Sequence, residues 1–318
     1  MIPFEWLERA RARIEPYVLR TPLTTDAGRD LHFKWENRQR TGSFKARGAF
    51  NKVLGLEPWE REAGLVAVSA GNHGQGVALA AQLSRTTVQV FVPQGTVRKK
   101  VDAMRALGAE VIFVQGGYGE AEIAGRDYAT THAKTWISPY DDGQVIAGQG
   151  TIALEALEQL AQDVSTWVVP VGGGGLISGI GAGLKHLAPH VRLVGVQSEA
   201  SAFAYNLFHR GTQAGVADLP SLADGLAGSV AEDSVTIPVM RDLLDDFVLV
   251  SEADIGRAMA FAWTEYGETI EGSSATALAA LLTRCVQDRP ALAVITGGNV
   301  QPDTHAALVA RYAESSWS

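Results

Sequence analysis

Lys45 stands in a setting where a lysine can become a nucleophile. Small and apolar residues flank it in the stretch Thr41-Gly42-Ser43-Phe44-Lys45-Ala46-Arg47-Gly48. One glycine lies three positions before the lysine, and another lies three positions after it. Desolvation lowers the pKa of an ammonium group, and the neutral amine can form a Schiff base with an aldehyde. Most lysines are solvated, so the stretch taken alone favours a surface lysine whose stem lies along Phe44.

Four consecutive glycines form the second chemistry-bearing feature. They follow an apolar run of strand length and precede a helical pattern, and they are Gly172, Gly173, Gly174 and Gly175. Amides at a helix start bind anions, and missing side chains let a phosphate approach the backbone. A dinucleotide site is the main alternative, but its Gly-x-Gly-x-x-Gly pattern lacks the third glycine, because Ile177 or Ser178 occupies that place. Glu199, near the end of the next strand, keeps this alternative open.

Two further turns end predicted strands. Ser69-Ala70-Gly71-Asn72-His73-Gly74 opens a helix, and its Ser69 and Asn72 side chains suit a carboxylate or a phenolic oxygen. Its simpler explanation is a helix cap at Asn72, with a structural His73. The second turn is Thr296-Gly297-Gly298-Asn299, and its simpler explanation is a plain turn without a binding role.

Strand and helix patterns alternate along the chain and predict the α/β class with parallel sheets. The expected strands are 31–36, 65–69, 87–92, 110–115, 167–171, 192–197, 247–250 and 291–296. The expected helices are 4–18, 46–54, 75–83, 97–107, 121–134, 151–162, 176–187, 252–266 and 274–284. Residues 145–150 lead into a helix, and 201–246 show no clear pattern. Because strand-end turns of a parallel sheet gather on one side, the three turns and Lys45 are expected to converge.

The chain divides into two β-α-β systems. Residues 64–140 are predicted to form a small domain inserted into a large domain of residues 1–63 and 141–318. Of the 318 residues, 46% are hydrophobic, which is typical of a well-cored globular protein.

Composition excludes several classes of protein. The net charge of −8 gives no footprint for nucleic acid. The single cysteine, Cys285, excludes an intrachain disulfide and a cysteine-rich metal site, and its apolar neighbours predict that it is buried. The start of the chain lacks the apolar core of a signal peptide, and no run is long enough to span a bilayer. A cytoplasmic protein without membrane contact is expected.

A reactive lysine, a phosphate cradle and a carboxylate-binding turn together suit pyridoxal phosphate held as a Schiff base. The chain resembles the serine/threonine dehydratase branch of the fold-type II, tryptophan synthase β-like pyridoxal-phosphate enzymes. The resemblance runs over nearly the whole length. It is carried by Arg20-Thr21-Pro22-Leu23, Gly42 to Gly48, Ser69 to Gly76, Ala106-Leu107-Gly108-Ala109-Glu110, Gly148-Gln149-Gly150-Thr151, Val171 to Leu176, Ala223-Asp224-Gly225 and Gly297-Gly298-Asn299.

The resemblance implies a cofactor site in the cleft between the two domains. Lys45 would carry the Schiff base, and Phe44 would pack beside the cofactor ring. Asn72 would meet the phenolic oxygen, and the four glycines would surround the phosphate. Thr296 would meet the ring nitrogen, where a neutral hydroxyl can donate to an unprotonated nitrogen.

The resemblance also implies the substrate contacts. The amino-acid carboxylate would be held by the turn that contains Ser69, Gly71, Asn72 and His73. No metal is expected, because Gln197 and Phe203 occupy places where the family's divalent-ion site has a Glu and an Asp. A homodimer is expected.

Two stretches depart from the family pattern, and one is Val300-Gln301-Pro302, which follows Asn299. Members commonly carry Glu-Pro-Ser/Thr-Gly-Ala where this chain has Glu271-Gly272-Ser273-Ser274-Ala275. The expected activity is an ammonia-lyase that converts a 3-hydroxy amino acid such as L-threonine or L-serine to a 2-oxo acid and ammonia. A racemase and a dehydratase of a bulkier 3-hydroxy amino acid are the alternatives within the family. A nicotinamide-dependent oxidoreductase and a non-catalytic nucleotide-binding module are the alternatives from other classes.

Overall fold

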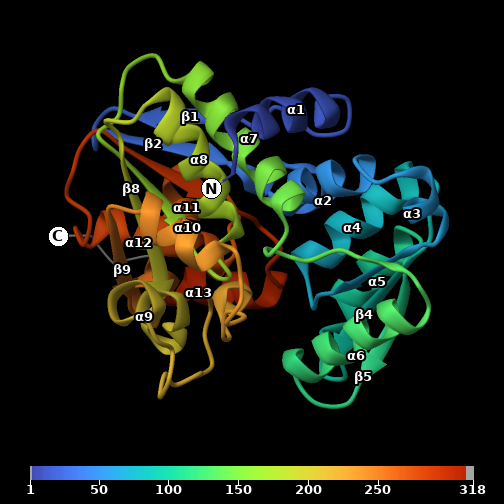
Figure 1. Ribbon diagram of the computed structural model, residues 1–318. Helices are drawn as coiled ribbons and strands as arrows, with labels where there is room; N and C mark the ends of the chain where they lie inside the picture. The colour runs from blue at the N-terminus through green and yellow to red at the C-terminus, as the bar shows by residue number, and fades with distance from the viewer. Residues whose placement is uncertain (1, 313–318) are drawn as a thin grey trace.

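The strands form two separate sheets (Figure 1), seen in a computed structural model that describes residues 2–312. The larger sheet has six strands in the order β1-β2-β10-β7-β8-β9, and the smaller has four in the order β5-β4-β3-β6. Every neighbouring pair is parallel except β1 and β2. The predicted α/β class with two parallel sheets is therefore confirmed.

Most strands match the predicted positions within two residues. In the larger sheet they are β1 (Leu23–Asp26), β2 (Leu31–Trp35), β7 (Thr166–Pro170), β8 (Arg192–Ser198), β9 (Asp246–Val250) and β10 (Ala291–Ile295). In the smaller sheet they are β3 (Leu65–Val68), β4 (Val88–Pro93), β5 (Glu110–Val114) and β6 (Thr135–Trp136). The sequence did not predict β1 or β6. β1 is only partly buried and lacks an apolar run, and β6 has two residues, so neither leaves a clear pattern.

Helices cover both sheets and connect their strands. They are α1 (Phe4–Ile14), α2 (Lys45–Leu54), α3 (Pro58–Glu62), α4 (Asn72–Leu83), α5 (Arg98–Ala106), α6 (Tyr118–Thr131), α7 (Gly143–Gln159), α8 (Gly175–Leu187), α9 (Phe203–Arg210), α10 (Thr236–Leu243), α11 (Glu252–Tyr266), α12 (Gly272–Leu282) and α13 (Pro302–Tyr312). Among the helices of residues 2–312, none combines the length and the apolar character that a membrane span requires.

Helix α7 corrects the sequence-based prediction, which began this helix only at Thr151. The helix starts eight residues earlier, where the Asp142 carboxylate accepts from the backbone N–H groups of Gln144 and Val145 at 2.8 and 3.0 Å. An aspartate that accepts from these positions is a strong helix N-cap. Glycines usually weaken a helix interior, which is why this first half carried no helical signal.

The glycines of α7 allow close packing on two sides. A Cβ at Gly148 would lie 2.7 Å from the carbonyl oxygen of Arg47 in α2. A Cβ at Gly150 would lie 2.6 Å from the carbonyl oxygen of Gly179 in α8. α7 therefore brings the helix that begins with Lys45 and the helix that follows the glycine turn into backbone contact.

The predicted boundary of the small domain lies within a shared core. Residues 65–136 supply all four strands of the smaller sheet. However, Ile14, Ala46 and Phe50, from α1 and α2, pack in the same apolar cluster as Leu65 and Val90. Figure 1 shows α2 between the two sheets. The division at residues 64 and 140 stays a prediction.

Cys285 differs from its predicted environment. It is exposed and lies beyond the end of α12 at Leu282. Apolar neighbours in the sequence predict burial only while the helix continues.

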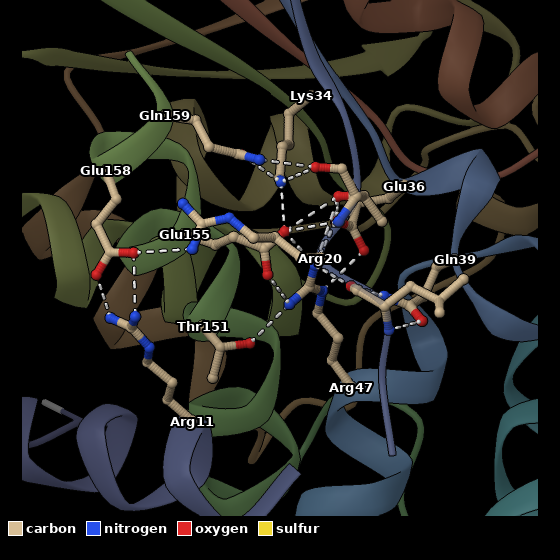
Figure 2. Close-up of polar contacts among 12 residues, drawn as sticks. Arg11, Arg20, Lys34, Glu36, Gln39, Arg47, Thr151, Glu155, Glu158 and Gln159 are labelled. Carbon is tan, nitrogen blue, oxygen red and sulfur yellow. Dashed lines mark hydrogen bonds and ion pairs between the residues drawn. The ribbon is translucent and has the colours of Figure 1, made fainter. Parts of the chain in front are cut away.

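A buried cluster of charges fixes the start of α2 (Figure 2). Arg47 donates to Glu36 at 2.7 and 2.8 Å and to Glu155 at 3.0 and 3.1 Å. Lys34 donates to the same Glu155 at 2.5 Å, and Thr21 donates to Glu36 at 2.6 Å. The two cations and two carboxylates balance, and they join β2, α2 and α7.

The charges of the cluster interact strongly because their side chains are almost entirely shielded from solvent. The side chains of Arg47 and Glu36 are 1% and 0% exposed. Burial lowers the pKa of Arg47, but Glu36 and Glu155 more than offset this effect and raise the pKa above its ordinary value. Removal of one member would leave a buried charge without its partner, which is among the costliest changes in a protein interior.

We expect Arg47→Met to lower the free energy of unfolding by about 3–5 kcal/mol, because Glu36 would then be buried without a counter-charge. Arg11→Met is the matched control. Arg11 pairs with Glu158, and their side chains are 43% and 41% exposed, so its loss should cost at most about 1 kcal/mol. Urea unfolding followed by circular dichroism measures both. Equal losses in the two variants would contradict the importance of the buried cluster.

Candidate active site

The predicted site residues lie around one cavity of about 680 Å³. The three turns and Lys45, which were predicted to converge, all contribute to its wall. The lining includes Phe44, Lys45, Ser69, Gly71, Asn72, His73, Gly172, Gly173, Gly174, Gly175 and Thr296. The convergence predicted from the strand ends is therefore what the geometry shows.

The lysine stretch is attached to the end of β10. The backbone N–H of Phe44 donates to the carbonyl oxygen of Thr296 at 3.0 Å, and Ser43 forms an isolated bridge with Gly297. The Lys45 Nζ atom donates to the carbonyl oxygen of Pro139 at 2.8 Å and lies 5.2 Å from the centroid of the Phe44 ring. Backbone hydrogen bonding between these two segments therefore places Lys45 close to Thr296.

The glycine turn connects β7 to α8 and has little room for side chains. Gly174 has φ +86°, a conformation that favours glycine. A Cβ at Gly173 would lie 2.4 Å from the ring of Tyr140. The Thr236 hydroxyl donates to the carbonyl oxygen of Gly173 at 2.7 Å and holds the turn in place. The first amides of α8 have no acceptor within the helix, so the turn presents donors suited to an anion.

The turn after β3 is partly occupied by its own contacts. The Ser69 hydroxyl accepts from the N–H of Gly71 at 3.0 Å. Asn72 donates to Glu271 at 2.7 Å and accepts from Asn299 at 2.7 Å, so its side chain reaches the segments before α12 and after β10. One hydrogen of the Asn72 amide and the hydroxyl hydrogen of Ser69 remain for a bound molecule.

The His73 ring has a structural partner. Its Nε2 atom lies 2.9 Å from the carbonyl oxygen of Ile137, and the residue is buried. Burial and the nearby Lys45 lower the pKa of His73 to about 3, so the ring is neutral near pH 7. Its backbone N–H lies in the first turn of α4, where it has no acceptor within the helix. This N–H group, and not the ring, is therefore available to a ligand.

Lys45 and Glu271 have opposite pKa shifts within the same cavity. Burial lowers the pKa of Lys45 to about 8, although Glu271 opposes this shift. Burial and Asp224 raise the pKa of Glu271 to about 7, while Asn72 and Lys100 oppose the shift. Near neutral pH a fraction of Lys45 is therefore the neutral, nucleophilic amine.

Sequence reasoning missed three contributors to the cavity. Glu271 lines it beside Lys45, and Tyr140 packs against the glycine turn. Lys100 of α5 pairs with Asp224 at 3.3 Å and joins the two sides of the cavity. Glu271 had a detectable signal, since a polar residue before small residues at a helix start repeats the pattern after β3. Tyr140 and the Lys100 pair had none, because they depend on the distance between the two sheets.

The residues present fit the pyridoxal phosphate that the sequence resemblance implies. A neutral amine for the aldehyde, helix-start amides for the phosphate and an aromatic wall for the ring line one cavity. A Cβ at Gly172 would lie 3.2 Å from the Cα of Leu226, so the turn is kept free of side chains. The donors and the amine therefore match the chemistry of this cofactor.

Comparison with known proteins extends this result to the whole chain. The family model for pyridoxal-phosphate dependent enzymes matches residues 14–297. An L-threonine ammonia-lyase of Geobacter sulfurreducens is 39% identical over 98% of this chain and 79% of its own length. A serine racemase of Arabidopsis thaliana is 36% identical over 92% of each chain. The structure of threonine deaminase isoform 2 from Solanum lycopersicum superposes with a TM-score of 0.89 at 31% identity, covering 98% of this chain and 93% of that one. The chain belongs to the family of pyridoxal-phosphate dependent enzymes.

Proposed function

We propose that this enzyme is an ammonia-lyase that converts a 3-hydroxy amino acid, L-threonine or L-serine, to a 2-oxo acid and ammonia. The observation that carries the proposal is the Lys45 amine, with its pKa lowered to about 8, in one cavity with the glycine turn. The relatives named for threonine ammonia-lyase activity, 38–40% identical to this chain, support the substrate class.

Lys45 is the residue that binds the cofactor covalently and moves the proton. The cofactor, when bound, supplies an electron sink for negative charge at the substrate α-carbon. When its Nζ atom is free and neutral, Lys45 would act as the base that takes the α-proton. Loss of the 3-hydroxyl as water, followed by hydrolysis, leaves a 2-oxo acid and ammonia.

The remaining residues bind and orient. Phe44 would pack beside the cofactor ring, and the remaining amide hydrogen of Asn72 would be available to its phenolic oxygen. The amides of Gly172, Gly173, Gly174 and Gly175 would hold the phosphate, and Thr296 would meet the ring nitrogen. The turn with Ser69, Gly71, Asn72 and His73 binds the substrate carboxylate, with His73 contributing its backbone N–H because its ring already contacts Ile137.

We assign residues 64–140 to a small domain that closes over the substrate, which the Lys100–Asp224 pair across the cavity supports. A cytoplasmic enzyme is consistent with the one cysteine of the chain, an exposed thiol suited to a reducing compartment. A homodimer rests on the sequence resemblance, and analytical ultracentrifugation tests it.

We expect Lys45→Ala to reduce release of 2-oxo acid from L-threonine by at least about 10³-fold, because the covalent attachment and the base are lost together. Borohydride should fix the cofactor to the parent enzyme, so that it survives unfolding, and should not fix it to the variant. Lys52→Ala is the control, since Lys52 lies on the same helix and pairs with Asp142 at 2.7 Å outside the cavity. Unchanged turnover in Lys45→Ala would refute the assignment.

Racemisation should be weak because Ala70 lines the cavity in the turn before Asn72. The sequence resemblance places a serine there in serine racemases, where it serves as an acid and base on the opposite face of the ring. Ala70 has no proton to give. We expect chiral chromatography to find little D-serine after long incubation of the enzyme with L-serine. Ala70→Ser should raise D-serine formation about tenfold or more. Abundant D-serine from the parent enzyme would show that another residue supplies the proton.

We expect no loss of activity in a chelator. The Gln197 amide is buried and engaged within the protein, accepting from the N–H of Tyr205 and donating to the carbonyl oxygen of Leu226, each at 3.2 Å. Phe203 has no oxygen ligand to offer a hard cation. The test compares initial rates after dialysis against chelator, with and without added magnesium. A loss that magnesium restores would contradict this expectation.

A further inference from the structure

The Ser274 hydroxyl makes three short contacts behind the wall of the cavity. It lies 2.9 Å from the hydroxyl of Thr296, 2.7 Å from the carbonyl oxygen of Gly297 and 2.6 Å from the nitrogen of Gly297. Ser274 is fully buried in the first turn of α12, whereas Thr296 lines the cavity. The serine therefore connects the cavity wall to the backbone behind it.

This serine is a particular feature of the chain. It occupies the glycine position of the Glu-Pro-Ser/Thr-Gly-Ala pattern that related enzymes commonly carry. A glycine has no hydroxyl, so the contact with Thr296 would be absent there. The chain has added a polar group directly behind the residue placed at the ring nitrogen.

The number of protons decides the direction of each hydrogen bond. The N–H of Gly297 can only donate and its carbonyl oxygen can only accept, while Ser274 has a single hydroxyl proton. If that proton pointed to Thr296, the Ser274 oxygen and the Gly297 carbonyl oxygen would face each other at 2.7 Å without a proton between them. Two oxygen atoms at that distance repel each other unless one donates.

Only one arrangement of the hydroxyl protons places a proton in each of the short contacts. Ser274 accepts from the N–H of Gly297 and donates to its carbonyl oxygen. Thr296 then donates its own proton to Ser274, away from the cavity. The oxygen lone pairs of Thr296 are left to face the bound molecule, so Thr296 is an acceptor there.

We propose that Ser274 is a positioning residue that holds the Thr296 hydroxyl as an acceptor and so favours the protonated ring nitrogen of the bound cofactor. This inference rests on the proposed placement of Thr296 at that nitrogen. It reverses the direction of the hydrogen bond expected from the sequence, in which Thr296 donates to an unprotonated nitrogen. A protonated ring is the stronger electron sink, so the serine would strengthen the carbanion-stabilising power of the site.

The test measures the ring nitrogen directly, in holoenzyme without substrate. Enzyme loaded with ¹⁵N-labelled pyridoxal phosphate should give a ring-nitrogen resonance at the position of a protonated pyridine. In Ser274→Ala the Thr296 proton is released and can turn toward the cavity. The resonance should move toward that of a neutral pyridine, and Ser274→Thr should restore it.

Two controls separate a positioning role from a structural one. Thr276→Val removes another buried hydroxyl of α12, whose partner is the carbonyl oxygen of Ser273 at 2.9 Å, and should leave the resonance unchanged. In a Thr296→Val background, the further change Ser274→Ala should have no effect, because the two residues act through one hydrogen bond.

The outcomes are distinguishable. The same resonance in the parent enzyme and in Ser274→Ala would overturn the role of Ser274, even though the cofactor is bound. A parent resonance typical of a neutral pyridine would also overturn it. Failure of the parent enzyme to retain pyridoxal phosphate would instead contradict the proposed function.

Discussion

The position of the reactive amine depends on the buried ion pair between Arg47 and Glu36. Arg47 lies two residues after Lys45 in α2, and its guanidinium bonds Glu36 after β2 and Glu155 in α7. Such a pair in a nearly dry interior tolerates little displacement, because separation would leave each charge unsolvated. The start of α2 is therefore fixed to the larger sheet, while the body of the helix packs in the core of the smaller one. The amine lies where these two constraints meet.

The second constraint is the close packing of α2, α7 and α8, which meet at glycines. Gly48 and Gly148 bring α2 against α7, and Gly150 and Gly179 bring α7 against α8. A single methyl group at any of these positions would overlap backbone or side-chain atoms at 2.3–2.8 Å. Through α7, the helix of the lysine and the helix of the glycine turn hold a fixed spacing. Charge pairing and close packing thus determine the same distance, that between the Lys45 amine and the glycine turn.

Much of this architecture could be predicted from the sequence because it is local. Apolar runs, glycine turns and the Lys45 stretch are each legible within ten residues, and the rule for parallel strand ends brought them to one side. The start of α7 was predicted too late because Gly148 and Gly150 suggested an interruption of the helix. In the structure these glycines allow close contacts between helices. The ring contact of His73 and the cavity position of Glu271 depend on Ile137 and Asn72, which lie far away in the sequence. Such contacts follow from the packing of the two sheets and leave no pattern in either segment.

The stretch that departs from the family pattern at residues 271–275 also contacts several other segments of the cavity wall. Glu271 accepts from Asn72 of the turn after β3, Ser273 accepts from the N–H of Gly225, and Ser274 contacts Gly297 at the end of β10. One short segment at the start of α12 therefore contacts three parts of the cavity wall. The family proline would remove a backbone N–H at position 272 and the family glycine would remove the Ser274 hydroxyl. In this chain, Cβ placement at Gly272 would come within 2.0 Å of the carbonyl oxygen of Leu222, so the backbone there is packed too closely for another residue without rearrangement. The two departures act on neighbouring parts of the site: Gly272 permits the close approach of Leu222, and Ser274 makes polar contacts with the strand end behind Thr296.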